Sequence, residues 1–125
     1  MSPDTRHYVS SGLGIPDFAV ATQRDESQSV VTVAGEVDVE TAPRLRKALI
    51  SAGDVPAPMV VVDLREVTFL DSTGLGVLVA GLKRARENGG DLRLVATSSH
   101  ILRMLAITRL DSVFSVYPDL GAARS

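Results

Sequence analysis

The sequence predicts a single α/β domain in which a mixed β-sheet packs against helices, in the order ββαβαβαβ. Three observations carry this prediction. Apolar runs of strand length alternate with amphipathic segments of helix length. One run, MVVVDL at 59–64, is β-branched over most of its length, as expected for a central parallel strand covered on both faces. With 125 residues, 45% of them hydrophobic, the chain suits one core and not two.

Two strands are expected near the N-terminus, at 17–23 and 30–34, because apolar and polar residues alternate in both. The polar segment 24–29 between them predicts a turn, so the pair should form an antiparallel hairpin. Residues 1–16 lack periodicity and predict a flexible N-terminal tail before a domain at 17–118. Residues 119–125 are expected to form a short C-terminal tail.

Three helices are expected, each with a 3.6-residue apolar repeat and a recognisable end. The first begins at Thr41 or Ala42, tolerates Pro43 in its first turn and is closed by Gly53. Gly89-Gly90 terminates the second, and Ser98 or Ser99 caps the third. The expected helices are 42–52, 73–88 and 99–108, and the strands that follow the hairpin are 59–64, 92–96 and 113–117.

The second helix has two different faces. One is a core stripe at i, i+3, i+4 spacing, formed by Leu75, Leu78, Val79, Leu82 and Ala85. The other carries mostly small residues where charges would be expected on a solvated face: Gly74, Gly76, Val77, Ala80, Gly81 and Arg84. Two interpretations remain open, a docking surface for another protein and packing against another helix of the same domain.

The segment 71–76, Asp-Ser-Thr-Gly-Leu-Gly, lies where the buried strand turns into this helix. A Ser or Asp there is most often a helix cap, but only one residue occupies the cap position, so the other side chains are available to solvent or to a partner. A phosphoryl group on Ser72 would add a charge of about −1.5 to −2 near the positive end of the helix dipole, which the domain should tolerate. The same dianion beside Asp71 would oppose the docking of a partner.

Composition excludes several classes of function. The net charge is −2, Lys and Arg are scattered and aromatic residues make up 4%, so nucleic-acid binding is disfavoured. There is no cysteine, and His7 and His100 are isolated, so no metal or other cofactor is implied. No apolar run approaches the ~20 residues needed to cross a bilayer, and the protein is expected to be cytoplasmic without membrane contact.

Enzymatic chemistry is also disfavoured. Ser72 could act as a nucleophile with His100 as base and Asp38 or Asp71 as the orienting acid, but the Gly-x-Ser-x-Gly elbow is missing. His100 is expected to face solvent at the start of the third helix. The pair Glu36 and Asp38 could serve acid–base chemistry, although carboxylates at a strand end more often cap or face solvent. Neither a complete dinucleotide fingerprint nor a phosphate loop is present.

The stretch from Val61 to Leu78, VVDLREVTFLDSTGLGVL, strongly resembles the STAS domain of anti-sigma factor antagonists. Further matches are Gly-Glu-Val-Asp at 35–38, Gly-Gly-Asp-Leu at 89–92 and the helix leading to Leu110. Together the matches cover residues 17–118, in family order and spacing.

The resemblance implies a regulatory cycle. The unphosphorylated protein would bind an anti-sigma factor that is also a serine kinase, and so free a sigma factor. Phosphorylation of Ser72 would release the complex, and a PP2C-type phosphatase would reset it. No ATP site is expected on this chain itself.

The resemblance also implies a partner-binding surface. Asp38 is expected to help engage the kinase, and Asp71 to shape the surroundings of the acceptor. The remaining residues of the expected surface are Ser72, Thr73, Gly74, Leu75, Gly76 and Val77. An alternative is a constitutive STAS scaffold or transport-accessory subunit in which Ser72 only caps a helix. An exposed face at Val77 and Gly81 would also allow a homodimer.

Overall fold

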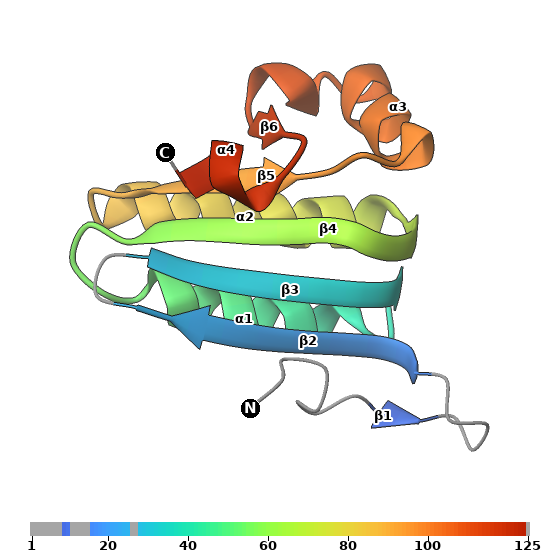
Figure 1. Cartoon of the computed structure of the whole chain (residues 1–125), viewed down its shortest axis with the longest axis horizontal. Helices are drawn as coiled ribbons and strands as arrows, with labels where there is room; N and C mark the ends of the chain where they lie inside the picture. The colour runs from blue at the N-terminus through green and yellow to red at the C-terminus, as the bar shows by residue number, and fades with distance from the viewer. Residues whose placement is uncertain (1–8, 11–15, 26–27, 125) are drawn as a thin grey trace.

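The computed structural model describes residues 9–10, 16–25 and 28–124. Their strands form one six-stranded sheet in the spatial order β1-β2-β3-β4-β5-β6 (Figure 1). The strands are β1 (Val9–Ser10), β2 (Pro16–Arg24), β3 (Gln28–Val37), β4 (Met59–Leu70), β5 (Asp91–Val95) and β6 (Ser115–Tyr117). The pairs β1–β2 and β2–β3 are antiparallel and the other three are parallel, so the predicted hairpin and mixed sheet are confirmed. Part of the predicted turn, Glu26 and Ser27, lies outside the described residues.

The helices are α1 (Ala42–Gly53), α2 (Ser72–Glu87), α3 (Ser99–Ile107) and α4 (Leu120–Arg124), and a 3-10 turn, η2 (Leu110–Ser112), precedes β6. Helices α1 and α2 lie together behind the sheet in Figure 1 and cover one of its faces. The core lies between them and the sheet, where Leu45, Leu49 and Leu78 are fully buried. From β2 to β6 the predicted order ββαβαβαβ is confirmed. Among the described residues, no helix is both long enough and apolar enough to span a bilayer.

Strand β4 is longer than the predicted 59–64 and continues to Leu70. Beyond Leu64 exposed and buried residues are mixed, so the second half of the strand is not a continuous apolar run and was not predicted. Pairing with β3 extends it, because the register continues to Val37 opposite Leu70. The extension therefore places Asp71 beside the end of β3.

Both ends of the chain hold structure where tails were expected. Val9–Ser10 pairs with β2, and the other residues of the expected N-terminal tail before Pro16 lie outside the described residues. At the other end α4 lies in front of the sheet, and its Ala123 is buried in a small second cluster with Val61 and Val95. The expected C-terminal tail at 119–125 is therefore corrected: residues 120–124 form the helix α4. This helix is too short for an apolar repeat to reveal it.

The small-residue face of α2 packs against α1. Val77 and Gly81 are buried, and a Cβ atom at Gly81 would lie 3.0 Å from Leu49 Cδ1, so glycine permits the close approach of the two helices. Packing within the domain is therefore the correct interpretation for Val77 and Gly81, whereas Gly76 on the same face is exposed. The suggestion that an exposed Val77 and Gly81 face meets a second copy is therefore wrong.

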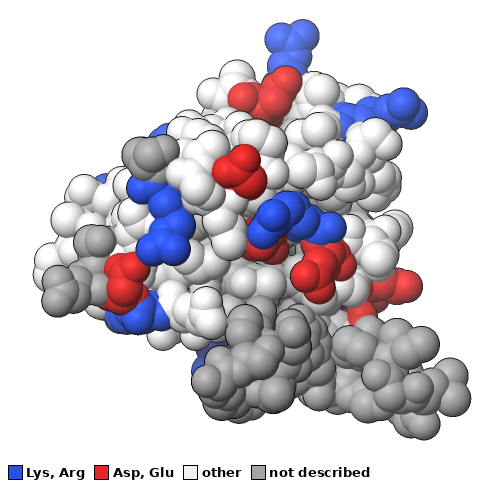
Figure 2. Space-filling model, in the orientation of Figure 1, with Lys and Arg blue, Asp and Glu red and all other residues white. Residues whose placement is uncertain are grey.

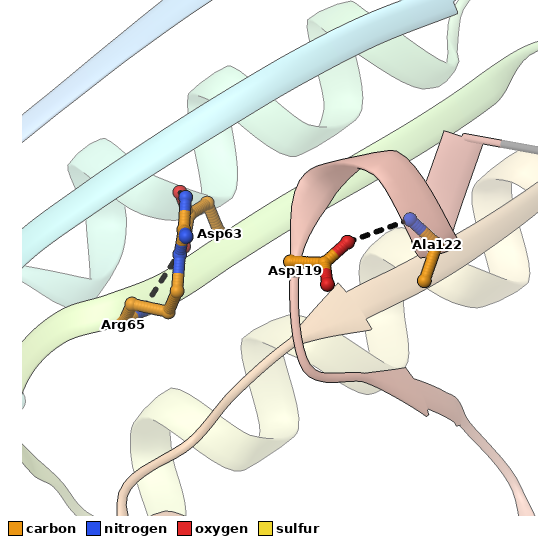
Figure 3. A network of polar contacts seen from close by, with 4 residues as sticks. All are labelled: Asp63, Arg65, Asp119 and Ala122. Atoms are coloured by element: carbon orange, nitrogen blue, oxygen red, sulfur yellow. Dashed lines mark hydrogen bonds and ion pairs between the residues drawn. The ribbon is translucent and has the colours of Figure 1, made fainter.

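The sheet face opposite α1 and α2 carries charges of both signs, interspersed over its surface (Figure 2). One pair is built into the sheet: Asp63 is buried, and Arg65 donates to both its carboxylate oxygens, at 3.0 and 2.9 Å (Figure 3). The hydrogen bonds that Arg65 donates to Asp63, and the negative charge of Asp63, raise the pKa of Arg65. Nearby, Asp119 accepts a hydrogen bond from the backbone N–H of Ala122 in α4. The charge of the buried Asp63 is thus compensated within the domain.

Candidate functional site

The junction between β4 and α2 is organised by Asp71. Its backbone is extended, and its Oδ1 accepts a hydrogen bond from the N–H of Gly74 at 3.0 Å, so Asp71 is the N-cap of α2. Its carbonyl accepts from the N–H of Leu75, and its own N–H donates to the carbonyl of Val37 at 3.2 Å. The last bond ties the start of α2 to the end of β3. The suggestion that Ser72 itself caps this helix is thus wrong.

Ser72 and Thr73 are the first two residues of α2, and both are exposed. Within the described part of the chain neither hydroxyl has a hydrogen-bond partner. Because Asp71 performs the capping, the hydroxyl of Ser72 is left at the surface beside the positive end of the α2 dipole. The helix begins one residue earlier than the predicted Thr73, which places Ser72 inside it.

Asp38 shapes the loop between β3 and α1. Its Oδ1 accepts hydrogen bonds from the backbone N–H groups of Glu40, at 2.9 Å, and Thr41, at 3.1 Å. The bond from Thr41 is the main reason that the pKa of Asp38 lies below its ordinary value of 3.8, and it outweighs the opposite effect of burial. The Thr41 hydroxyl donates in turn to the carbonyl of Glu36 at 2.8 Å. Asp38 therefore caps backbone N–H groups of the loop, which is the structural role that a carboxylate at a strand end often has.

The loop held by Asp38 and the start of α2 are neighbours, because β3 and β4 are adjacent parallel strands that end together. Carboxylates gather at this edge: Glu36 and Glu40 are exposed, and Asp38 and Asp71 are partly exposed. A phosphoryl group on Ser72 would add a further negative charge to this group. The described residues contain no group of three or more His, Cys, Asp or Glu able to hold a metal ion.

Three of the residues predicted to face a partner are buried instead. Leu75 and Val77 belong to the core, and a Cβ atom on Gly74 would overlap with Leu70 and lie 2.9 Å from Val37 Cγ1. Gly76 is exposed, and a Cβ atom there would meet nothing within 4 Å. The exposed part of the candidate surface is therefore Asp38, Asp71, Ser72, Thr73 and Gly76.

Two apolar side chains at the same edge of the sheet were not among the predicted site residues. Val39 is 70% exposed in the loop after β3, and Phe69 is 43% exposed near the end of β4. The Phe69 ring stacks on His100, with ring centroids 6.3 Å apart. Val39 lies between the acidic residues Asp38 and Glu40, which is a signal in the sequence, whereas Phe69 lies inside β4 and has no such signal. His100 lies on α3, as expected, and it makes no hydrogen bond to Ser72 within the described residues.

Comparison with known proteins gives one consistent result. The family model described as the STAS domain matches residues 19–123. An anti-sigma-B factor antagonist of Bacillus subtilis is 35% identical over 97 residues, which are 78% of this chain and 88% of that protein. One from Listeria monocytogenes is 35% identical over 94 residues, 75% of this chain and 82% of that protein.

A solved structure gives the same picture. The crystal structure of an anti-sigma factor antagonist from Mycobacterium paratuberculosis is similar with a TM-score of 0.76 at 35% identity, covering 87% of this chain and 93% of that one. These relatives are named for a regulatory role and not for a catalysed reaction. The chain therefore belongs to the STAS domain family.

Proposed function

We propose that the protein is an anti-sigma factor antagonist that is switched by phosphorylation of Ser72. Unphosphorylated, it binds an anti-sigma factor that is also a serine kinase, and so frees a sigma factor in the cytoplasm. Phosphorylation releases the complex, and a PP2C-type phosphatase restores the binding form. The supporting observation is the exposed Ser72 hydroxyl, which Asp71 leaves available by capping α2, in a chain 35% identical to named antagonists.

The proposed switch acts by charge on a preformed surface. The bond from Gly74 to Asp71 does not involve Ser72, so the start of α2 keeps its cap when Ser72 is modified. The helix dipole favours an anion at this position, and the domain remains folded. The partner, in contrast, meets a dianion beside Asp71 and Asp38, which raises the cost of removing water from the contact.

The proposed contact surface combines polar and apolar groups. Ser72, Thr73 and Gly76 give a smooth exposed strip on the first turns of α2. Val39 and Phe69 add apolar area at the same edge of the sheet. Interfaces usually have such a composition, with apolar anchors surrounded by polar groups.

Peptide mapping by mass spectrometry tests the phosphorylation site. Wild type, Ser72→Ala and Thr73→Ala are incubated with ATP and a lysate of the source cells, then digested with trypsin. Cleavage after Arg65 and Lys83 releases one peptide that contains Thr68, Ser72 and Thr73, so fragment ions must assign the phosphate. We expect it on Ser72 in wild type and in Thr73→Ala, and none on this peptide in Ser72→Ala.

Two results would contradict the proposal. Phosphate on Thr68 or Thr73 in the wild type would move the switch to another residue. No phosphate, although the cognate kinase binds the protein, would favour the constitutive scaffold or transport-accessory subunit.

A further inference from the structure

The helix layer has a charge opposite to that of the chain as a whole. The chain has a net charge of −2, yet α1 has no acidic residue and α2 has only Glu87. The cations of these two helices are Arg44, Arg46, Lys47, Lys83, Arg84 and Arg86. The opposite face of the sheet, shown in Figure 2, has interspersed charges of both signs. The outer surface of α1 and α2 is thus a basic region on an acidic protein.

A groove of about 440 Å³ lies between the two helices on this surface. It is lined by Arg46, Ile50, Ala80, Lys83, Arg84 and Glu87, and we call it the α1–α2 groove. Ile50 and Ala80 are half-buried and give it an apolar component. The charged lining consists of three cations and one carboxylate, so the groove itself carries excess positive charge.

Arg84 lacks good partners in this position. Its Nε is buried and has no hydrogen-bond partner within the described part of the chain. Its Nη2 lies 3.7 Å from Oδ1 of Asp54, whose side chain is 65% exposed, and such a long and solvated ion pair contributes little. An oxyanion in the groove would pair more closely with the Arg84 guanidinium, whose side chain is 40% exposed, than Asp54 does.

We propose that the α1–α2 groove binds an acidic peptide segment of a partner protein. Carboxylates of the segment would pair with Arg46, Lys83 and Arg84, and its aliphatic side chains would contact Ile50 and Ala80. A peptide suits the groove better than a nucleic acid does, because Glu87 lies in the lining and none of the described lining residues offers an aromatic ring for base stacking. The negative charge of the whole chain also repels a long polyanion.

This site is separate from the Ser72 surface. Lys83 is eleven residues further along α2 than Ser72, and at 1.5 Å per residue the two lie about 16 Å apart along the helix axis. A charge placed on Ser72 should therefore act on the groove only weakly. The groove can be tested with Ser72→Asp, so failure of this inference and failure of the proposed switch are distinguishable.

Fluorescence anisotropy with a labelled peptide of repeated Glu-Glu-Leu tests the inference. The full chain is compared with Arg46→Glu/Lys83→Glu and with a control, Lys47→Glu/Arg103→Glu, which makes the same charge change outside the groove lining. We expect salt-sensitive binding by wild type, about a tenfold or greater loss in the groove variant and less than about a threefold loss in the control. Ser72→Asp should bind the peptide as wild type does.

Several outcomes would overturn the inference. These are equal losses in the groove and control variants, no binding by wild type at low salt, and tighter binding of a DNA duplex than of the peptide. A dimer in sedimentation that Arg46→Glu/Lys83→Glu dissociates would identify a second copy as the occupant instead. If circular dichroism shows the Glu variant to be unfolded, Arg46→Gln/Lys83→Gln replaces it, and a loss no greater than in the matching Gln control would reject the groove.

Discussion

Helices α2 and α3 begin in the same way but in different surroundings. Each starts with an N-cap residue of extended backbone, Asp71 or Ser98, followed by an exposed serine, Ser72 or Ser99. The caps differ in strength. The carboxylate Oδ1 of Asp71 accepts from the backbone N–H of Gly74 at 3.0 Å, whereas the neutral hydroxyl of Ser98 accepts from the N–H of Ile101 at 3.4 Å. Asp71 is also bonded through its N–H to the end of β3.

The surroundings explain why only one of these serines is proposed as a switch. Ser72 lies beside the loop held by Asp38, where carboxylates already gather. Ser99 is followed by His100, whose ring stacks on Phe69. An exposed serine at the start of a helix is therefore not a switch by itself. The charge and rigidity around it decide what a phosphoryl group would do.

The largest expected effect comes from filling the first turn of α2. Its third residue is Gly74, where the equivalent position of α3 is the buried Ile101. Gly74→Ala would force its Cβ against Leu70 and Val37, and overpacking of this kind typically costs about 1–3 kcal/mol. Urea denaturation measures the loss. Unchanged stability would contradict the prediction that a Cβ atom at residue 74 is too close to Leu70 and Val37.

Removing the two caps compares the helix starts directly. Asp71→Ala should lower the free energy of unfolding by about 1–2 kcal/mol, because it removes both a hydrogen bond and a favourable charge at the helix N-terminus. Ser98→Ala should cost less, about 0.5–1 kcal/mol, because its bond is longer and neutral. Denaturation of both variants under one set of conditions checks the order. A larger loss for Ser98→Ala would contradict the comparison.

A substitution at Gly76 should change the stability of the domain and its affinity for the partner in opposite directions. Gly76→Ala should raise the free energy of unfolding by about 0.5–1 kcal/mol, because alanine favours the helix and its Cβ would meet no other atom. The proposed partner surface includes this residue, so the same variant should bind the partner more weakly although it is more stable. Calorimetric unfolding and partner binding are measured on one preparation. A more stable variant with unchanged affinity would remove Gly76 from the surface.

The smallest effect concerns the charge of Asp38. Because its pKa is lowered in the folded state, its carboxylate stabilises the fold above the ordinary value of 3.8, and this contribution is lost as the pH falls through the folded value. Asp38→Asn keeps the shape and removes the charge. The stability difference between wild type and this variant should therefore be larger at neutral pH than near pH ~3. An equal difference at both pH values would contradict the role of the charge.

Apolar repeats in the sequence predicted most of the helices and strands. The choice of the residue that caps α2 could not be predicted in this way. The apolar repeat located α1, with Leu45, Leu49 and Ala52 inward as expected. It could not choose between Asp71 and Ser72 as the cap, because both residue types cap equally well. That choice depends on the bond between Asp71 and Val37, which exists only after β3 and β4 have paired.

The site was harder to predict than the fold. Small residues on one side of α2 allow packing against a helix of the same domain or against another protein, and only the position of α1 decides between the two. The ion pair of the buried Asp63 and the exposed Arg65 interrupts an apolar strand, although its spacing of two residues placed both on one sheet face. Val39 and Phe69 were overlooked because exposure depends on how the strands end.

The central claim is that a negative charge on Ser72 releases the partner. Titration calorimetry of the cognate anti-sigma factor kinase with wild type, Ser72→Asp and Ser99→Asp tests it most directly. The last variant adds the same charge at the same position of the neighbouring helix. The proposed function predicts that Ser72→Asp weakens binding about 30-fold or more and Ser99→Asp less than about threefold. Wild-type affinity in Ser72→Asp, or equal losses in the two variants, would contradict it.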